Sequence, residues 1–292
     1  MSQSPLHRLP AELLVLVFNS LPRIKDAVSL ALTCKKTYAL FERFEDRARI
    51  IYSIVDNIPT SLPKSYPTKS WLEGYFPPNT PLWTPTATHI PKELEHEETL
   101  AFLKTTGFPI FECERLDFSS RILEPAEPGK KSEDDAPPVS KRKVDETSQR
   151  ASSEDGSGEE DSGKEDEDGG EKEDEQWKDP LHLGTWFSQD VAVDSRTGKI
   201  QRRSWDDDGD DEDEDEDIAE NVGRFLVLLG VIRSVMCDLQ ICGLQRFRKE
   251  QIERDEEVEE VVLEKLFEGL GAVDQLVKEA AFWGWICNYL CT

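Results

Sequence analysis

The stretch LPAELLVLVFNSL, residues 9–21, decides how the start of this 292-residue chain folds. Pro10 and Glu12 are residues typical of the start of a helix, and Pro22, directly after the stretch, is expected to end that helix. Its helical part carries apolar residues on nearly every side, at Leu13, Leu14, Val15, Leu16, Val17, Phe18 and Leu21. A unit of about forty residues has one small core, which cannot bury every face of such a helix. The surplus apolar surface therefore packs on the rest of the chain or on a partner protein.

A second helix is expected after Pro22, with Asp26 as its N-cap. Its apolar positions would be Val28, Leu30, Leu32 and Cys34. The apolar pattern continues at Tyr38, Leu40, Phe41 and Phe44. Residues 1–45 are therefore predicted to form a compact unit of three helices.

This unit resembles the F-box family. The resemblance rests on the L-P-x-E-L-L start at residues 9–14, on Asp26 and Leu30, and on L-T-C-K-K at residues 32–36. Many family members carry a Trp near Thr37 and Tyr38, where this chain has none. The resemblance implies a surface that binds the linker subunit of SCF ubiquitin ligases and, through it, a cullin scaffold. Carried over by position, the candidate partner-binding residues are Pro10, Glu12, Leu13, Leu14, Val17, Leu21, Leu32 and Cys34. The alternative is a helical subdomain that packs permanently on the body.

Residues 46–292 are predicted to be an α+β body. Its proline-rich and aromatic-rich part, residues 50–90, is expected to be ordered but irregular, with one short helix near 70–75. We expect a helix next, from Pro91 to Thr105, which Gly107 ends, and then one or two strands in 108–118. Ordered structure should resume at 181–187 and continue with a hairpin over 190–200. Helices near 218–246, 251–268 and 272–290 complete the body, so its sheet should be small and antiparallel.

Acidic residues are concentrated in two tracts. Residues 144–179 have a net charge of −12, and residues 206–217 have a net charge of −11. The two tracts thus account for most of the chain's net charge of −26. Residues 126–178 are poor in apolar side chains and are predicted to be disordered, and 206–217 are predicted to be an acidic loop. Because the rest of the chain is close to neutral, nucleic-acid binding is not expected.

A second resemblance concerns the body. Residues 99–109 with Gly107 and Pro109, the predicted hairpin at 190–200, and a helix that begins near Asn221 occur in the order typical of the SUKH (Smi/Knr-like) superfamily. The C-terminal Phe282 and Trp283 also suit a closing helix. This resemblance implies an α+β fold that binds proteins and has no catalytic role.

No catalytic, cofactor-binding or metal-ligating motif is found in the sequence, so we do not expect an enzyme. The most apolar stretch, Phe225–Ile232, is too short to span a bilayer, and no membrane association is expected. The six cysteines include no Cys-x-x-Cys pair, which favours free thiols. Basic residues suggest a two-part nuclear import signal, unless they only balance charge, at Lys130, Lys131, Lys141, Arg142 and Lys143.

Two functions follow. The first is an F-box adaptor that binds the SCF linker subunit through its N-terminal helices and recruits an unknown protein for ubiquitination through its body. The second is a non-degradative SUKH-like scaffold whose acidic tracts bind basic partners. Salt distinguishes the two hypotheses, because binding through the tracts should be lost at high ionic strength and apolar docking should persist.

Overall fold

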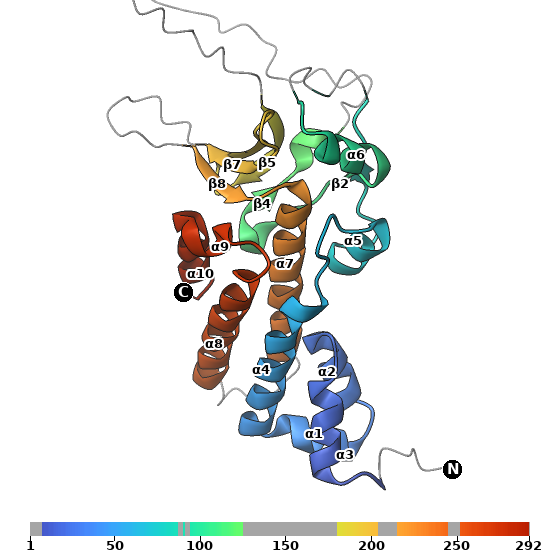
Figure 1. Cartoon of the computed structure of the whole chain (residues 1–292). Helices are drawn as coiled ribbons and strands as arrows, with labels where there is room; N and C mark the ends of the chain where they lie inside the picture. Colours follow the sequence, from blue (N-terminus) through green and yellow to red (C-terminus); the bar gives the residue numbers. More distant parts are fainter. Residues whose placement is uncertain are drawn as a thin grey trace, which may run out of the picture. The chain divides into compact units, whose positions relative to one another are not determined.

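The computed structural model describes residues 8–86, 90, 94–124, 180–203, 215–244 and 252–291. The segments on both sides of the long gap belong to one compact unit. The expected disorder of 126–178, most of the acidic loop and the basic residues of the import signal lie outside the described residues. Within them, helices precede, flank and follow an antiparallel sheet, which confirms the α+β class (Figure 1).

Four helices begin the chain: α1 Ala11–Asn19, α2 Ile24–Ala31, α3 Lys35–Glu42 and α4 Phe44–Ser61. The bounds of α1 agree with the prediction from Pro10 and Pro22. The second helix differs from it, because Arg23 is the N-cap and Asp26 lies in the first turn, where its charge favours the helix dipole. That helix also ends before Leu32, and Cys34 is instead the N-cap of α3.

Helix α4 corrects the expectation of irregular structure from residue 50. Its eighteen residues bury one apolar face, formed by Ile50, Ile51, Ile54, Val55 and Ile58. The region's first proline, Pro59, lies in the last turn of α4, and the others follow the helix. The average proline content of 50–90 therefore concealed a helix that has no proline before its last turn. The short helix expected near 70–75 is confirmed as α5, Lys69–Tyr75.

The main sheet has six antiparallel strands in the order of the chain. Its strands are β3 Glu112–Cys113, β4 Phe118–Ser119, β5 Leu181–Trp186, β6 Gln189–Val193, β7 Ile200–Arg203 and β8 Glu216–Ala219. The predicted hairpin is confirmed as β6 and β7, and Gly198 in its turn has a φ of +75°. A separate pair joins β1 Leu82–Trp83 to β2 Phe108–Pro109. Short 3-10 turns, η2 Glu114–Leu116 and η3 Arg121–Leu123, connect strands.

The end of the acidic tract belongs to the sheet, contrary to the prediction of a loop through 217. Strand β8 contains Glu216 and Asp217, and it pairs with the basic strand β7. Lys199 lies 2.5 Å from a carboxylate oxygen of Asp217, and Arg202 lies 3.4 Å from one of Glu216. Opposite charges across neighbouring strands stabilise the pairing. The helix expected from Ile218 therefore begins four residues later.

The other helices are α6 Glu97–Thr105, α7 Val222–Leu244, α8 Ile252–Leu270, α9 Leu276–Glu279 and α10 Ala281–Cys291. Helix α6 begins later than Pro91, with His96 as its N-cap, and the predicted last helix is divided into α9 and α10. Helix α8 packs along α4, and α7 contacts α2, α5 and α8 (Figure 1). Aromatic rings of Phe118, Trp186, Phe225, Phe282 and Trp283 fill the core between the sheet and the helices.

Helix α7 is longer and more apolar than the eight-residue stretch noted in the sequence. Among the described residues it is the one helix long and apolar enough to cross a membrane, over Val222–Cys242. However, 78% of that window is buried inside the protein. The central helix of a protein core is as apolar as a membrane-spanning helix. Helix α7 contacts α2, α5 and α8, so it is the central helix of this core.

Candidate protein-docking site

Helix α1 has a buried apolar face and an exposed one. Leu14 and Phe18 are fully buried, and the ring of Phe18 stacks on that of Phe41 from α3 at a centroid distance of 5.7 Å. On the other face, Leu13 is 45% exposed and Leu16 is 62% exposed. Residues three or four apart share one face of a helix. Leu13 and Leu16 therefore form a continuous apolar strip on the surface.

The turn between α2 and α3 exposes a third leucine. Leu32 is the C-cap of α2 and is 54% exposed. The fully buried Thr37 fixes this turn, because its hydroxyl lies 3.1 Å from the carbonyl oxygen of Ala31 and 2.9 Å from that of Cys34. The ammonium group of Lys36 donates a hydrogen bond to the carbonyl oxygen of Leu9, just before α1. These contacts hold the α2–α3 turn to the start of α1.

Cys34 is half-buried in the same turn. Its Sγ lies 3.2 Å from Oγ1 of Thr37. A hydrogen bond from this hydroxyl lowers the pKa of the Cys34 thiol below its ordinary value. Thr37 therefore orients the Cys34 side chain as well as the turn.

The structure separates the predicted site residues into three groups. Pro10, Glu12, Leu13 and Leu32 are exposed, and Val17, Leu21 and Cys34 are half-buried. Leu14 is different, because it lies in the interior and cannot contact a partner in this conformation. The prediction omitted Leu16, the most exposed large apolar residue of α1. Its spacing of three from Leu13 was the signal in the sequence that could have identified it.

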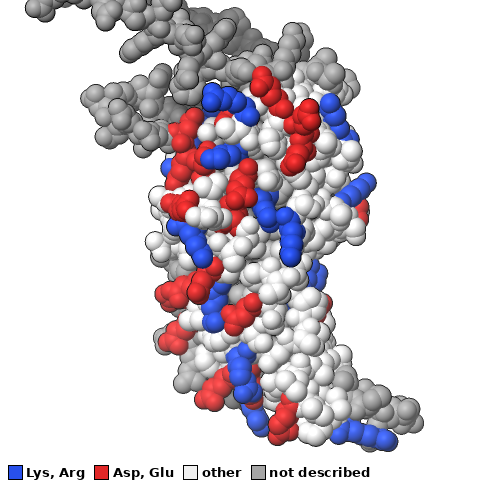
Figure 2. Space-filling model, in the orientation of Figure 1, with Lys and Arg blue, Asp and Glu red and all other residues white. Residues whose placement is uncertain are grey.

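The visible face of the N-terminal helices carries few charges, although Glu12 beside Leu13 and Lys35 after Leu32 are exposed. In Figure 2, the lower right part of the molecule, which covers the N-terminal helices, is largely white, whereas acidic and basic groups alternate over the rest of the visible face. We name the exposed side chains of Leu13, Leu16 and Leu32, with Pro10, the apolar strip of α1–α3. Large apolar side chains gathered on a surface are typical of a protein–protein interface.

Arg23 joins the N-terminal helices to the body. Its guanidinium group donates hydrogen bonds to the carbonyl oxygen of Gly74 in α5, at 2.8 Å, and to the hydroxyl of Ser234 in α7. Nη2 lies 3.3 Å from Oδ1 of Asp238, and the guanidinium covers the ring of Tyr75 at 5.4 Å. Asp238 Oδ2 also accepts a hydrogen bond from the backbone N–H of Lys25, at 3.2 Å. The strip is thus held by directional contacts to two helices of the body.

Burial dominates the electrostatics of this joint. It raises the pKa of the Asp238 carboxyl above its ordinary value, although the Arg23 charge and the Lys25 N–H act in the opposite direction. The side chain of Asp238 is only 4% exposed and that of Arg23 18%. No signal in the sequence relates these two residues, which are 215 positions apart.

A comparison of the chain with protein-family models matches residues 6–48 to the F-box domain. No curated protein and no solved structure matches the chain. The matched range contains α1, α2, α3 and the start of α4, and thus the whole apolar strip. Nothing in these comparisons supports the SUKH resemblance of the body, which stays a prediction from short motifs. F-box proteins are typically adaptors and not enzymes. Residues 6–48 of this chain are thus similar to the F-box domain, a module that generally binds the linker subunit of SCF ubiquitin ligases and thereby the cullin scaffold.

Proposed function

We propose that this protein is a substrate adaptor of an SCF ubiquitin ligase. Its apolar strip docks on the linker subunit, and its body binds the protein that is to be ubiquitinated. The adaptor makes no bond itself. It accelerates transfer because it holds the substrate at a high effective concentration near the transferring enzyme.

The exposure of Leu13, Leu16 and Leu32 is the observation that carries this proposal. Transferring a leucine side chain fully from water to an apolar interface stabilises a complex by about 1.5–3 kcal/mol. Three leucines that are about half exposed would together contribute several kcal/mol on docking. The alternative, in which the body covers the surplus apolar surface of the unit, is not favoured, because these three side chains stay exposed although the unit packs on the body.

The contacts between Arg23 and the body also support the proposal. An adaptor has to hold its substrate in a defined position relative to the ligase, since a flexible connection would dilute the effective concentration. Here the F-box helices contact α5 and α7 through hydrogen bonds, an ion pair and a cation–π contact. A protein bound on the body would therefore move together with the docking helices.

The affinity of the full chain for the purified linker subunit tests the proposal. We expect a direct complex in isothermal titration calorimetry, and Leu13→Asp combined with Leu16→Asp should weaken it roughly a hundredfold or more. Leu14 is unsuitable for this test, because an aspartate in the core would unfold the domain.

Ile122 offers a matched control, because it is 63% exposed but lies in η3, outside the F-box domain. Ile122→Asp should leave the affinity unchanged. Failure of the wild type to bind would contradict the proposal. So would an unchanged affinity of the Leu13/Leu16 variant.

The scaffold hypothesis remains a second prediction. Its acidic tracts lie largely outside the described residues, and the described end of the second tract pairs with β7 within the sheet. No contact among the described residues favours this hypothesis over the adaptor.

A further inference from the structure

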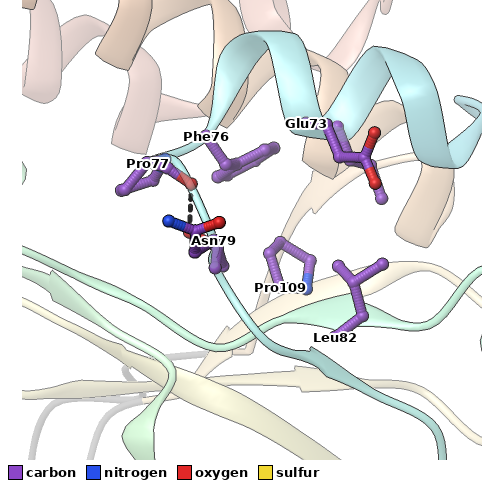
Figure 3. A pocket seen from close by; sticks show the side chains of 8 residues that line it. Glu73, Phe76, Pro77, Asn79, Leu82 and Pro109 are labelled. Carbon is purple, nitrogen blue, oxygen red and sulfur yellow. Dashed lines mark hydrogen bonds between the residues drawn. The ribbon is translucent and has the colours of Figure 1, made fainter.

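A pocket of about 250 Å³ lies on the body, beside α5 and the β1–β2 pair. Its walls are formed by Leu72, Glu73, Phe76, Pro77, Asn79, Thr80, Leu82 and Pro109. In Figure 3, Glu73 of α5 and Phe76 directly after this helix lie on one side, Leu82 and Pro109 on the opposite side, and Asn79 at one end. The volume is below the roughly 300–1,000 Å³ of sites for small-molecule ligands. It therefore suits one inserted side chain better than a whole cofactor.

The walls of the pocket are fixed by the fold. Strand β1 places Leu82 directly opposite Pro109 of β2. In the loop between α5 and β1, the N–H and the hydroxyl of Thr80 lie 3.2 Å and 2.7 Å from the carbonyl oxygen of Pro77. Asn79 has a φ of +64°, a left-handed conformation that asparagine adopts more readily than most other residues and that is typical of a turn. A shape held in this way loses little entropy on binding.

The pocket combines apolar walls with one negative charge. Among its lining residues Glu73 is the only ionisable one, and within the described part of the chain its carboxylate has no ion pair or hydrogen bond. Phe76 and Leu82 would contact an aliphatic stem, and Glu73 would pair with a positive charge at its tip. Lysine and arginine have this construction, with an apolar stem and a charged end.

The pocket shares a helix with the joint to the F-box domain. Arg23 bonds to the carbonyl oxygen of Gly74 and covers Tyr75, while the residues directly before and after them, Glu73 and Phe76, line the pocket. Helix α5 thus contacts the docking unit and forms one wall of the pocket. A ligand seated there would be held at a fixed position relative to the linker subunit.

We propose that this pocket is the substrate-recognition site of the adaptor and that it takes a lysine or arginine side chain from a segment of the recruited protein. This inference rests on the proposed function for its biological role. The binding preference itself belongs to the body and does not require the linker subunit.

The test uses the full chain alone and a library of fluorescent nonapeptides in which the central residue is fixed and the flanking residues are randomised. Fluorescence polarisation should give an affinity about threefold to tenfold higher for central Lys or Arg than for central Met, which has an apolar stem without the charge. Glu73→Gln should abolish this preference, and Glu73→Lys should shift it to central Asp or Glu. Glu264→Gln, at an exposed carboxylate of α8, serves as the matched control and should retain the wild-type preference.

Equal binding of all central residues would overturn the proposal, as would a basic preference that persists in Glu73→Gln. Circular dichroism melts of each variant would detect a loss of folding. Titration of the same variants with the linker subunit keeps the two proposals separate. If the chain fails to bind the linker subunit but keeps its peptide preference, only the adaptor role is contradicted. If it binds the linker subunit but shows no peptide preference, only the proposal for the pocket is contradicted.

Discussion

Arg23 and Asp238 form a largely buried ion pair across the junction of the F-box domain and the body, with Nη2 of Arg23 3.3 Å from Oδ1 of Asp238. Removing one member of such a pair leaves a charge without compensation in the interior, which costs about 3–5 kcal/mol. Burial already raises the pKa of Asp238, so the carboxylate is costly even with its partner present. We therefore expect the pair to contribute more to the alignment of the two parts than to net stability.

Arg23→Met should lower the free energy of unfolding by about 3 kcal/mol, because it leaves the Asp238 carboxylate without its partner. Urea denaturation measures this change. Combining it with Asp238→Asn should recover part of the loss, since the asparagine carries no charge. Arg49→Met is the control, because Arg49 pairs with Asp46 on the surface at 2.8 Å and its loss should cost less than about 1 kcal/mol. Equal losses for the two arginines would contradict this account of the joint.

The raised pKa of Asp238 predicts an unusual dependence of stability on pH. The folded state binds the proton more tightly than the unfolded state, so this residue's contribution to stability is most favourable below its ordinary pKa. The contribution should fall as the pH rises through the raised value and then stay constant. The free energy of unfolding of the wild type minus that of Asp238→Asn, measured from pH 3 to 8, isolates this residue. A difference that increases with pH would mean that the pKa is lowered instead.

The two faces of α1 should respond differently to truncation. Leu14→Ala removes a fully buried side chain and should lower the free energy of unfolding by about 2–5 kcal/mol. Leu16→Ala removes an exposed one and should change stability by less than about 0.5 kcal/mol. Only Leu16→Ala should then weaken linker binding without affecting folding. Comparable destabilisation by both variants would place Leu16 in the core.

Two glycines test the packing of the body. An added Cβ at Gly184 in β5 would lie 2.3 Å from the carbonyl oxygen of Ser119, so Gly184→Ala should destabilise the protein by about 1–3 kcal/mol. A Cβ at Gly74 in α5 would meet no atom within 4 Å. Gly74→Ala should stabilise the helix by up to about 1 kcal/mol. Thermal melts compare the two variants, and a stable Gly184→Ala would refute the close approach of β4 and β5.

Local signals made part of this structure predictable from the sequence. Prolines on both sides of an apolar run delimit α1, and alternating apolar residues followed by Gly198 indicate the β6–β7 hairpin. Interactions between distant segments were not predictable. The charges of Glu216 and Asp217 suggest a solvated loop until the basic residues of β7 are known to lie opposite them. From the sequence, Arg23 would likewise be expected at the surface, because its partners Ser234 and Asp238 are more than 200 positions away.

The docking site was partly predictable for the same reason. The family pattern identified Leu13 and Leu32, which are exposed. It also included Leu14, because a sequence motif does not distinguish residues that build a surface from residues that support it. The helical spacing of Leu14 and Phe18 assigns both to the core, where Phe18 stacks on Phe41. The structure adds Leu16 to the strip.

A photo-crosslinking amino acid at position 16 tests the central claim most directly. p-Benzoylphenylalanine replaces Leu16 in one sample and Ile122 in another, and each is irradiated with an equimolar amount of the linker subunit. Our account predicts a cross-link to the linker subunit from position 16 and none from position 122. A complex that forms while position 16 cross-links only to its own chain would contradict it.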